Sequence, residues 1–210
     1  MFRDRIEAGR MLAEKLKKYK GSNGIVLAVP RGGVPVAYAV AKELNIPVDI
    51  VLTKKIGHPA NKEYAIGAAS LTDYFVLPHT GVSDEYIQNE VEKVRERLRE
   101  MYKKFMGESV PESITGKTVI VTDDGIATGN TFLGTVRILR KDHPAKIVIA
   151  APVASASAVQ KLSKEADEVV VVSIPDEFYG VGGFYEDFQQ VSDEEVMYYL
   201  GKLRKLKKAV

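Results

Sequence analysis

The sequence of 210 residues predicts an α/β fold in which a central, mostly parallel sheet is flanked by helices. Two observations predict this fold. Short runs of β-branched and other apolar residues recur along the chain, as is typical of strands that are buried on both faces. Segments with the apolar periodicity of helices separate these runs, and strand–helix–strand successions at this spacing form right-handed βαβ units.

Composition limits the classes of protein that the chain can belong to. Hydrophobic residues make up 45% and charged residues 28%, which is typical of one globular domain of this length. The net charge of +2 is too small to indicate a nucleic-acid partner, and the absence of cysteine excludes disulfides and thiol metal sites. No apolar run reaches the length of a membrane span, and the N-terminal residues have no signal core. A cytoplasmic protein without a membrane partner is therefore expected, and a homo-oligomer is left open.

The first half of the chain contains one complete strand–helix–strand unit. The elements predicted there are a helix over residues 3–20, a buried strand at 24–29, a helix over 34–44, a buried strand at 47–53, and a hairpin of two short strands over 64–77. Residues 54–63 contain Gly, Pro, Asn and four charges without an apolar period. They are predicted to form a loop that is long enough to be functional and mobile.

A long helix is predicted next. Ser83 is a good N-cap, apolar residues follow at steps of four and three, and Gly107 supplies the stop. The single apolar seam could pair in a coiled coil, but packing against the chain's own sheet is favoured because only about three heptads are present. The later elements are a helix over 132–140, a strand at 145–153, a helix over 155–165, a buried strand at 168–174, an irregular aromatic stretch at 176–190, and a last helix opened by a capping box at 192–195.

The most informative stretch reads KTVIVTDDGIATGNT, from Lys117 to Thr131. A short β-branched strand ends at the acidic pair Asp123 and Asp124, and a loop of small residues leads into a helix. Loop amides and a helix N-terminus favour an anion, while two carboxylates can accept hydrogen bonds from vicinal hydroxyls. A phosphorylated ribose carries both kinds of group. The alternative is a solvated turn followed by a capped helix.

This stretch resembles the phosphoribosyl-diphosphate (PRPP) signature of type I phosphoribosyltransferases, which is a strand, two acidic residues, four variable residues and Thr-Gly. The resemblance implies that Asp123 and Asp124 hold the ribose 2′ and 3′ hydroxyls. The residues that would cradle the 5′-phosphate are Ile126, Ala127, Thr128, Gly129, Asn130 and Thr131. The resemblance also implies one domain over residues 1–210. Its core would lie at about 21–175, and a small hood would be formed by about 1–20 and 176–210.

Two further segments carry charge and follow predicted strands. Arg31, Gly32 and Gly33 follow the first strand, where glycines let backbone amides approach an anion and an arginine adds a positive fork. A tight turn is the alternative. The segment resembles the family's pyrophosphate loop, which often contains a strained non-proline peptide bond. Lys54 and Lys55 follow the second strand and would neutralise charge on departing pyrophosphate, or are solvated lysines.

The aromatic stretch at 176–190 suits stacking on a planar base, with core packing of a C-terminal flap as the alternative. It looks like the base-binding segment of hypoxanthine–guanine phosphoribosyltransferases. That resemblance implies that Phe178 stacks on the base, that Val181 contacts the base through its backbone, and that Asp187 faces a magnesium ion. Ala127 and Ala166 depart from the residues with which those enzymes recognise a 6-oxopurine. The sequence therefore does not identify the base.

The resemblance implies a Mg²⁺-dependent enzyme that moves the phosphoribosyl group from PRPP to a nitrogenous base, with a purine-like base favoured, and releases pyrophosphate. Asp123, Asp124, Arg31, Lys54 and Lys55 are the residues expected to act on the reacting groups. A non-catalytic PRPP-binding regulator is the second hypothesis. A hydrolase or nucleotide-sugar enzyme with the same layout is the third, because fold does not imply function.

Overall fold

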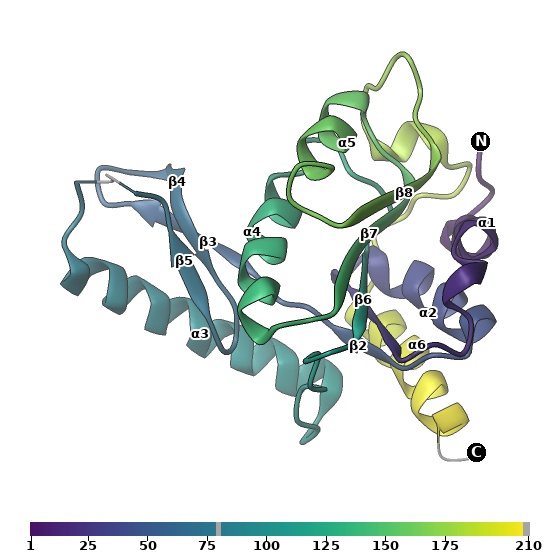
Figure 1. Ribbon diagram of the computed structural model, residues 1–210, viewed down its shortest axis with the longest axis horizontal. Coiled ribbons are helices and arrows are strands. Elements are labelled where there is room, and N and C mark those ends of the chain that lie inside the picture. Colours follow the sequence, from purple (N-terminus) through teal and green to yellow (C-terminus); the bar gives the residue numbers. More distant parts are fainter. Residues whose placement is uncertain (79–80, 208–210) are drawn as a thin grey trace.

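The protein is described by a computed structural model that covers residues 1–78 and 81–207, with side chains described as far as residue 203. The last three residues of the predicted hood lie outside this part of the chain. A five-stranded parallel sheet forms the centre (Figure 1). Its strands, in spatial order, are β2 (Val48–Ile50), β1 (Gly24–Ala28), β6 (Thr118–Thr122), β7 (Lys146–Val153) and β8 (Glu168–Ser173). The predicted α/β fold with a mostly parallel central sheet is confirmed.

Helices cover both faces of this sheet (Figure 1). One face carries α1 (Arg5–Lys15), α2 (Gly33–Leu44) and α6 (Asp193–Lys207), and the other carries α4 (Asn130–Leu139) and α5 (Ala156–Leu162). Short 3₁₀ turns occur at η1 (Lys17–Tyr19), η2 (Arg140–Asp142) and η3 (Val181–Phe184). Because successive strand residues point to opposite faces, the strands bury both sets of side chains.

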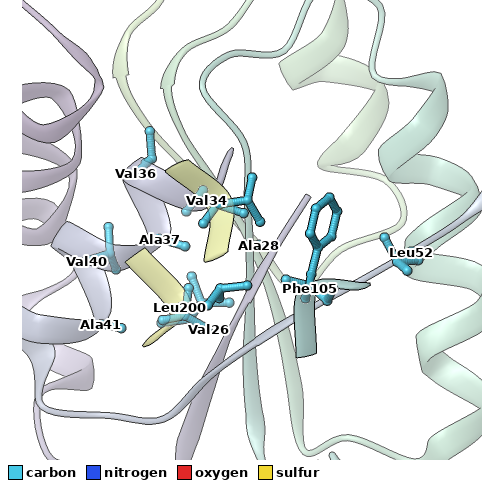
Figure 2. Close-up of a cluster of buried hydrophobic side chains, with 14 of the residues drawn as sticks. Val26, Ala28, Val34, Val36, Ala37, Val40, Ala41, Leu52, Phe105 and Leu200 are labelled. Atoms are coloured by element: carbon cyan, nitrogen blue, oxygen red, sulfur yellow. The ribbon is translucent and has the colours of Figure 1, made fainter. Parts of the chain in front are cut away.

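The residues of β1 demonstrate this two-sided burial. Val26 and Ala28 pack into the cluster under α2 and α6, whereas Ile25 and Leu27 pack into the cluster under α4 and α5. Figure 2 shows the first of these clusters, in which side chains of β1, α2 and α6 gather. Phe105, from the long helix at Asp84–Met106, lies beside them. The loops at the strand ends are thereby held on a rigid support.

A second, antiparallel sheet lies beside the first one (Figure 1). It consists of β3 (Lys54–His58), β4 (Asn61–Ala69) and β5 (Tyr74–Val76), and α3 (Asp84–Met106) packs along it. The prediction of a loop over residues 54–63 is wrong, because this segment forms β3 and the start of β4. The pairing register shifts on both sides of Gly57, where an added Cβ would lie 2.5 Å from the carbonyl oxygen of Lys62. This irregularity removes the alternation by which a strand is recognised in a sequence.

Local signals at helix ends and turns agree with the structure. The hairpin predicted over residues 64–77 is present as β4 and β5. The Ser83 hydroxyl accepts a hydrogen bond from the Tyr86 amide, and Gly107 ends α3 with φ 63°. The capping box before α6 is reciprocal, because Ser192 and Glu195 each accept from the other's amide. The apolar seam of α3 is buried in the chain's own core except at Met101, which is 40% exposed.

Three elements differ from their predicted form. The first helix, predicted over residues 3–20, ends at Lys15 and continues as the 3₁₀ turn η1. All six residues of β8 are half-buried rather than buried, because β8 is an edge strand. In β2, the Asp49 side chain is 2% exposed and accepts hydrogen bonds from the Tyr102 hydroxyl and two amides. Burial raises the pKa of Asp49.

In the part of the chain that the structure describes, no helix has the length and hydrophobicity to cross a membrane.

A polar cluster joins the end of the N-terminal helical segment to the sheet edge. Glu168 accepts hydrogen bonds from Tyr19 at 2.6 Å, Lys18 at 2.6 Å and Lys146 at 2.8 Å. Partial burial raises the pKa of Glu168, but hydrogen bonds from Lys146, Lys18 and Tyr19 outweigh burial and lower it to about 2. Glu168 therefore stabilises the fold fully above pH 4.5, and this contribution is lost as the pH falls from 4.5 towards about 2.

We expect Glu168→Gln to lower the free energy of unfolding by about 1–2 kcal/mol at pH 7, since the partly exposed lysines are screened by water. The difference from the unaltered protein should shrink as the pH falls below 4.5. Urea unfolding at several pH values measures both effects. Glu100→Gln, on the exposed face of α3, is the matched control. Equal stability of the two variants at pH 7 would contradict the stabilising role assigned to Glu168.

Candidate active site

The order of the central strands determines where loops can form a crevice. From β1 the chain proceeds to β2 on one side, whereas from β6 it proceeds to β7 on the other. The connections after β1 and β6 therefore diverge, and ligands of open α/β sheets bind at such a switch point beside the carboxyl ends of the strands. The segment 30–33 follows β1 and the acidic pair follows β6, so topology brings the two predicted motifs together.

The two motifs are in direct contact. A Cβ on Gly32 would lie 2.1 Å from Asp124 Oδ2, and one on Gly33 would lie 2.8 Å from the Cα of Asp123. Only glycine allows this approach, because real Cβ atoms do not come within 3.0 Å of other atoms. The Pro30–Arg31 peptide bond is cis, a non-proline bond of the kind that the resemblance implied. Residues about 90 positions apart in the chain thus form one site.

The acidic pair lies in a partly desolvated position. Asp123 Oδ1 accepts a hydrogen bond from the Asp124 amide at 2.8 Å. Burial raises the pKa of Asp123, and the neighbouring charge of Asp124 raises it further. Burial also raises the pKa of Asp124, against the opposing effect of Arg5. The pair is therefore less acidic than two solvated carboxylates.

Arg5, at the start of α1, is a site residue that the sequence did not indicate. Its Nε donates to Asp124 Oδ2 at 2.8 Å, and its Nη1 donates to the Gln189 carbonyl at 2.9 Å. The guanidinium carbon lies 4.0 Å from the centre of the Phe188 ring. Arg5 and Asp124 are 119 residues apart, and no local pattern marks such a pair.

The N- and C-terminal segments meet above the acidic pair. Phe2 pairs with Tyr185 through a short bridge of parallel backbone. The Tyr185 hydroxyl donates to the Asp124 carbonyl at 2.6 Å. Burial and the charge of Asp124 raise the pKa of Tyr185, so its hydroxyl remains a donor at neutral pH. The division into a core and a hood stays a prediction, although these contacts join the segments assigned to the hood.

The predicted phosphate loop runs from β6 to α4. Ile126 is 2% exposed, and its backbone bridges to the end of β7, so its side chain belongs to the core. Gly129 has φ 74° and begins α4, whose first amides have no partners within the helix. The residues exposed beside it are Ala127, Thr128, Asn130 and Thr131. This arrangement presents a helix N-terminus to solvent at the site's edge.

Helix α5 supports the same loop from outside. The Ser155 hydroxyl donates to the Ala127 carbonyl at 2.6 Å. Lys161 Nζ donates to the Thr128 carbonyl at 3.1 Å and to Asn130 Oδ1 at 3.0 Å. Lys161 therefore adds a cation to the loop, and it is a second residue that the sequence did not indicate because α5 carries no motif.

A cavity of about 570 Å³ opens beside the acidic pair. Arg5, Arg31, Gly32, Asp124 and Phe188 are among the residues that line it, whereas neither Lys54 nor Lys55 does. Arg31 Nε forms an ion pair with Asp193 Oδ1 at 2.8 Å, and Asp193 also pairs with Lys104.

The two lysines lie on the second sheet. Lys54 is exposed at the start of β3, and Lys55 pairs with Glu63 across the hairpin at 2.7 Å. Their contact with departing pyrophosphate stays a prediction.

The aromatic stretch forms a cluster of its own. Phe178 stacks on Phe184 at 5.5 Å, and Tyr185 lies 5.0 Å from Phe188. Val181 packs over the acidic loop, because a Cβ on Gly125 would lie 2.4 Å from its Cγ1. Core packing of the C-terminal segment therefore accounts for much of this stretch. Base contacts of Phe178 and Val181 stay predictions.

Asp187, the predicted magnesium ligand, is exposed, and its carboxylate accepts from the Gln189 amide at 3.3 Å. Within residues 1–78 and 81–203, no group of three or more His, Asp or Glu side chains gathers as a metal site. A magnesium ion that is held mainly by substrate oxygens, as is usual for Mg²⁺ in phosphate sites, would not need such a group. The side chains present are compatible with that kind of binding.

The fold and the site define an α/β protein with an acidic pair, and a loop of small residues that leads into a helix N-terminus, at the switch point of a parallel sheet. The family model of the phosphoribosyl transferase domain matches residues 4–189, and the chain belongs to this family. The membership inferred from the PRPP signature is confirmed.

Individual relatives agree with this membership. The chain is 37% identical to TT1426 from Thermus thermophilus, whose crystal structure superposes with a TM-score of 0.84 over 97% of this chain and 99% of that one. It is 35% identical over 207 residues to a Mycobacterium tuberculosis protein that is provisionally named a phosphoribosyl transferase. This match covers 96% of the chain but 47% of the relative, so the chain spans about half the length of that protein. A match of 39% over 62 residues links it to the ribose-phosphate pyrophosphokinase of Pyrococcus furiosus, covering 29% of the chain and 22% of that enzyme.

Proposed function

We propose that the chain transfers the phosphoribosyl group of PRPP to a nitrogenous base and releases pyrophosphate. The observation that carries the proposal is the contact of Gly32 with the Asp124 carboxylate. The glycine loop, which we assign to the pyrophosphate, lies against the acidic pair, which we assign to the ribose hydroxyls, and Arg31 lines the same cavity. PRPP has a pyrophosphate and two vicinal hydroxyls on neighbouring ribose carbons, so one molecule can engage both features.

Each group of residues has a role in this reaction. Asp123 and Asp124 accept hydrogen bonds from the ribose hydroxyls, and the loop 126–131 holds the 5′-phosphate by its amides and helix N-terminus. Gly32, Gly33 and Arg31 hold the pyrophosphate. As the bond between the anomeric carbon and the pyrophosphate oxygen breaks, positive charge develops on the ribose. The acidic pair stabilises this charge while a base nitrogen forms the new bond.

A magnesium ion would be held by PRPP oxygens, with Asp187 as the predicted protein ligand, and would screen charge on the leaving pyrophosphate. The base is proposed to bind beside Phe178 and Val181 and to be purine-like. Ala127 and Ala166 stand where 6-oxopurine enzymes have an acidic residue and a lysine, so the particular base is a matter for experiment. Location in the cytoplasm and self-association also stay predictions.

The test is a screen of purine and pyrimidine bases for pyrophosphate release from PRPP with Mg²⁺. Exchange of labelled pyrophosphate into PRPP, measured with each base present, supplies a second readout. We expect turnover with at least one base. Binding of PRPP without turnover or exchange would favour the non-catalytic regulator, and absence of PRPP binding would refute both proposals.

A further inference from the structure

The Arg5 guanidinium is built into the cavity beside the acidic pair. The side chains of Arg5 and Asp124 are only 11% and 14% exposed. A surface ion pair would contribute little, but a pair that has lost most of its hydration is sensitive to the loss of one partner. This burial indicates that the position of Arg5 affects the ionisation state of the Asp124 carboxyl.

Three contacts hold the guanidinium in one orientation. Nη1 donates to the Gln189 carbonyl, the planar group lies over the Phe188 ring at 4.0 Å, and Nε then meets Asp124 Oδ2 at 2.8 Å. Stacking and hydrogen bonding by different parts of the fork are characteristic of arginine and are not reproduced by lysine. The C-terminal segment thus aims a residue of α1 at a carboxylate that follows β6.

The other charged and titratable groups around Asp124 do not supply this cation. Asp123 is a second acid on the same segment. Tyr185 approaches from the C-terminal segment but donates to the Asp124 backbone carbonyl. Arg31, after β1, lines the same cavity and is ion-paired with Asp193 of α6. Among the described residues, Arg5 is the cation that contacts the acidic pair.

We propose that Arg5 is a positioning residue that keeps Asp124 ionised and holds its carboxylate in place for the ribose hydroxyls of PRPP. The ligand in this inference, PRPP, rests on the proposed function. The effect of Arg5 on the charge state of Asp124 does not depend on that function. Asp124 Oδ2 accepts the hydrogen bond from Arg5, which leaves Asp124 Oδ1 as the oxygen for a ribose hydroxyl in this proposal. Without the cation, burial and the adjacent Asp123 favour a proton on the pair at neutral pH, and a protonated carboxyl is a poorer acceptor.

The charge state can be measured without any ligand. Carboxyl ¹³C NMR of aspartate-labelled protein follows the titration of Asp124, whose signal is identified by its loss in Asp124→Asn. We expect Arg5→Met to raise the pKa of Asp124 by about one unit or more and Arg5→Lys to raise it less. Arg3→Met is the matched control, since Arg3 is 63% exposed and pairs only with neighbours on its own segment, Asp4 and Glu7, in the described structure. An unchanged Asp124 titration in Arg5→Met would overturn the inference.

Calorimetric titration with PRPP from pH 6 to pH 9 tests the consequence for binding. For Arg5→Met, we expect affinity about tenfold weaker at pH 6 than at pH 9, whereas the unaltered protein and Arg3→Met should show a much flatter profile. Arg5→Lys should recover part of the affinity. An equal loss of PRPP affinity at every pH would show that Arg5 has a purely structural role and would overturn the inference. If the unaltered protein does not bind PRPP, the proposed function fails, while the NMR titration still decides the role of Arg5.

Discussion

Replacing Asp123 and Asp124 together by asparagine is expected to weaken PRPP binding by about a hundredfold or more. Hydrogen bonds to charged groups contribute about 1.5–3 kcal/mol each, so the loss of two carboxylates corresponds to at least about 3 kcal/mol. Asparagine keeps the size of aspartate and one acceptor oxygen, so the contacts of Gly32 and Gly33 with this segment can be retained. Calorimetry with PRPP and Mg²⁺ measures the effect.

Asp142→Asn is the control for this experiment, because Asp142 is an exposed acid outside the cavity. Cooperative thermal unfolding of the double variant establishes that the fold is kept. Since burial raises the pKa of Asp123, its ionised form opposes folding, and this unfavourable effect grows as the pH rises through the raised pKa. Removing the Asp123 charge should therefore not destabilise the fold, whereas removing the Asp124 charge leaves Arg5 without its ion-pair partner and should lower stability. Unchanged PRPP affinity in a folded double variant would refute the central assignment.

Gly32→Ala is expected to lower kcat/KM for PRPP by about a hundredfold or more. The backbone at Gly32 has φ −57° and ψ −35°, which alanine adopts freely, so the effect comes from the added methyl group alone. That carbon would lie 2.1 Å from Asp124 Oδ2 and 2.7 Å from Cγ, so the carboxylate must move. A displacement of about 1 Å in a reacting group is enough for a hundredfold loss.

Gly183→Ala is the matched control, because a Cβ there meets nothing within 4 Å although the residue lies in the C-terminal segment near the site. It should keep the kinetic constants of the unaltered protein. The Asp124 carboxyl signal should shift in the Gly32 variant and stay in place in the Gly183 variant. If Gly32→Ala shows normal kinetics, the close approach of the two loops has no role in the reaction.

Local patterns carried much of the fold and part of the site. Buried strands such as 118–122 are recognised because parallel strands between two helical layers have apolar side chains on both faces. Helix ends are recognised because the unpaired amides need partners close in sequence, as at Ser83 and Ser192. The acidic pair and its loop are also contiguous, so their likeness to a PRPP site could be found before any fold was known.

Other features follow from an irregular register or from residues that are distant in the sequence. The hairpin at 54–63 was missed because its register shifts at Gly57 hide the alternation of its strands. Asp49 was expected to be part of an ordinary strand, yet Tyr102 and two amides satisfy its buried carboxylate. For Asp49, the Tyr102 hydroxyl and the Glu112 amide come from segments more than 50 residues away, which a local pattern does not encode.

By itself, the sequence determined an α/β phosphoribosyltransferase-like chain with Asp123 and Asp124 at a strand end, because strands, caps and this loop are local patterns. Only the tertiary structure decided that Gly32 lies against Asp124 and that Arg5 forms an ion pair with the Asp124 carboxylate. The physical reason is that strand order sets which loops share a crevice, and helix packing sets which cation reaches a desolvated carboxylate. Both are properties of the assembled layers rather than of any one segment.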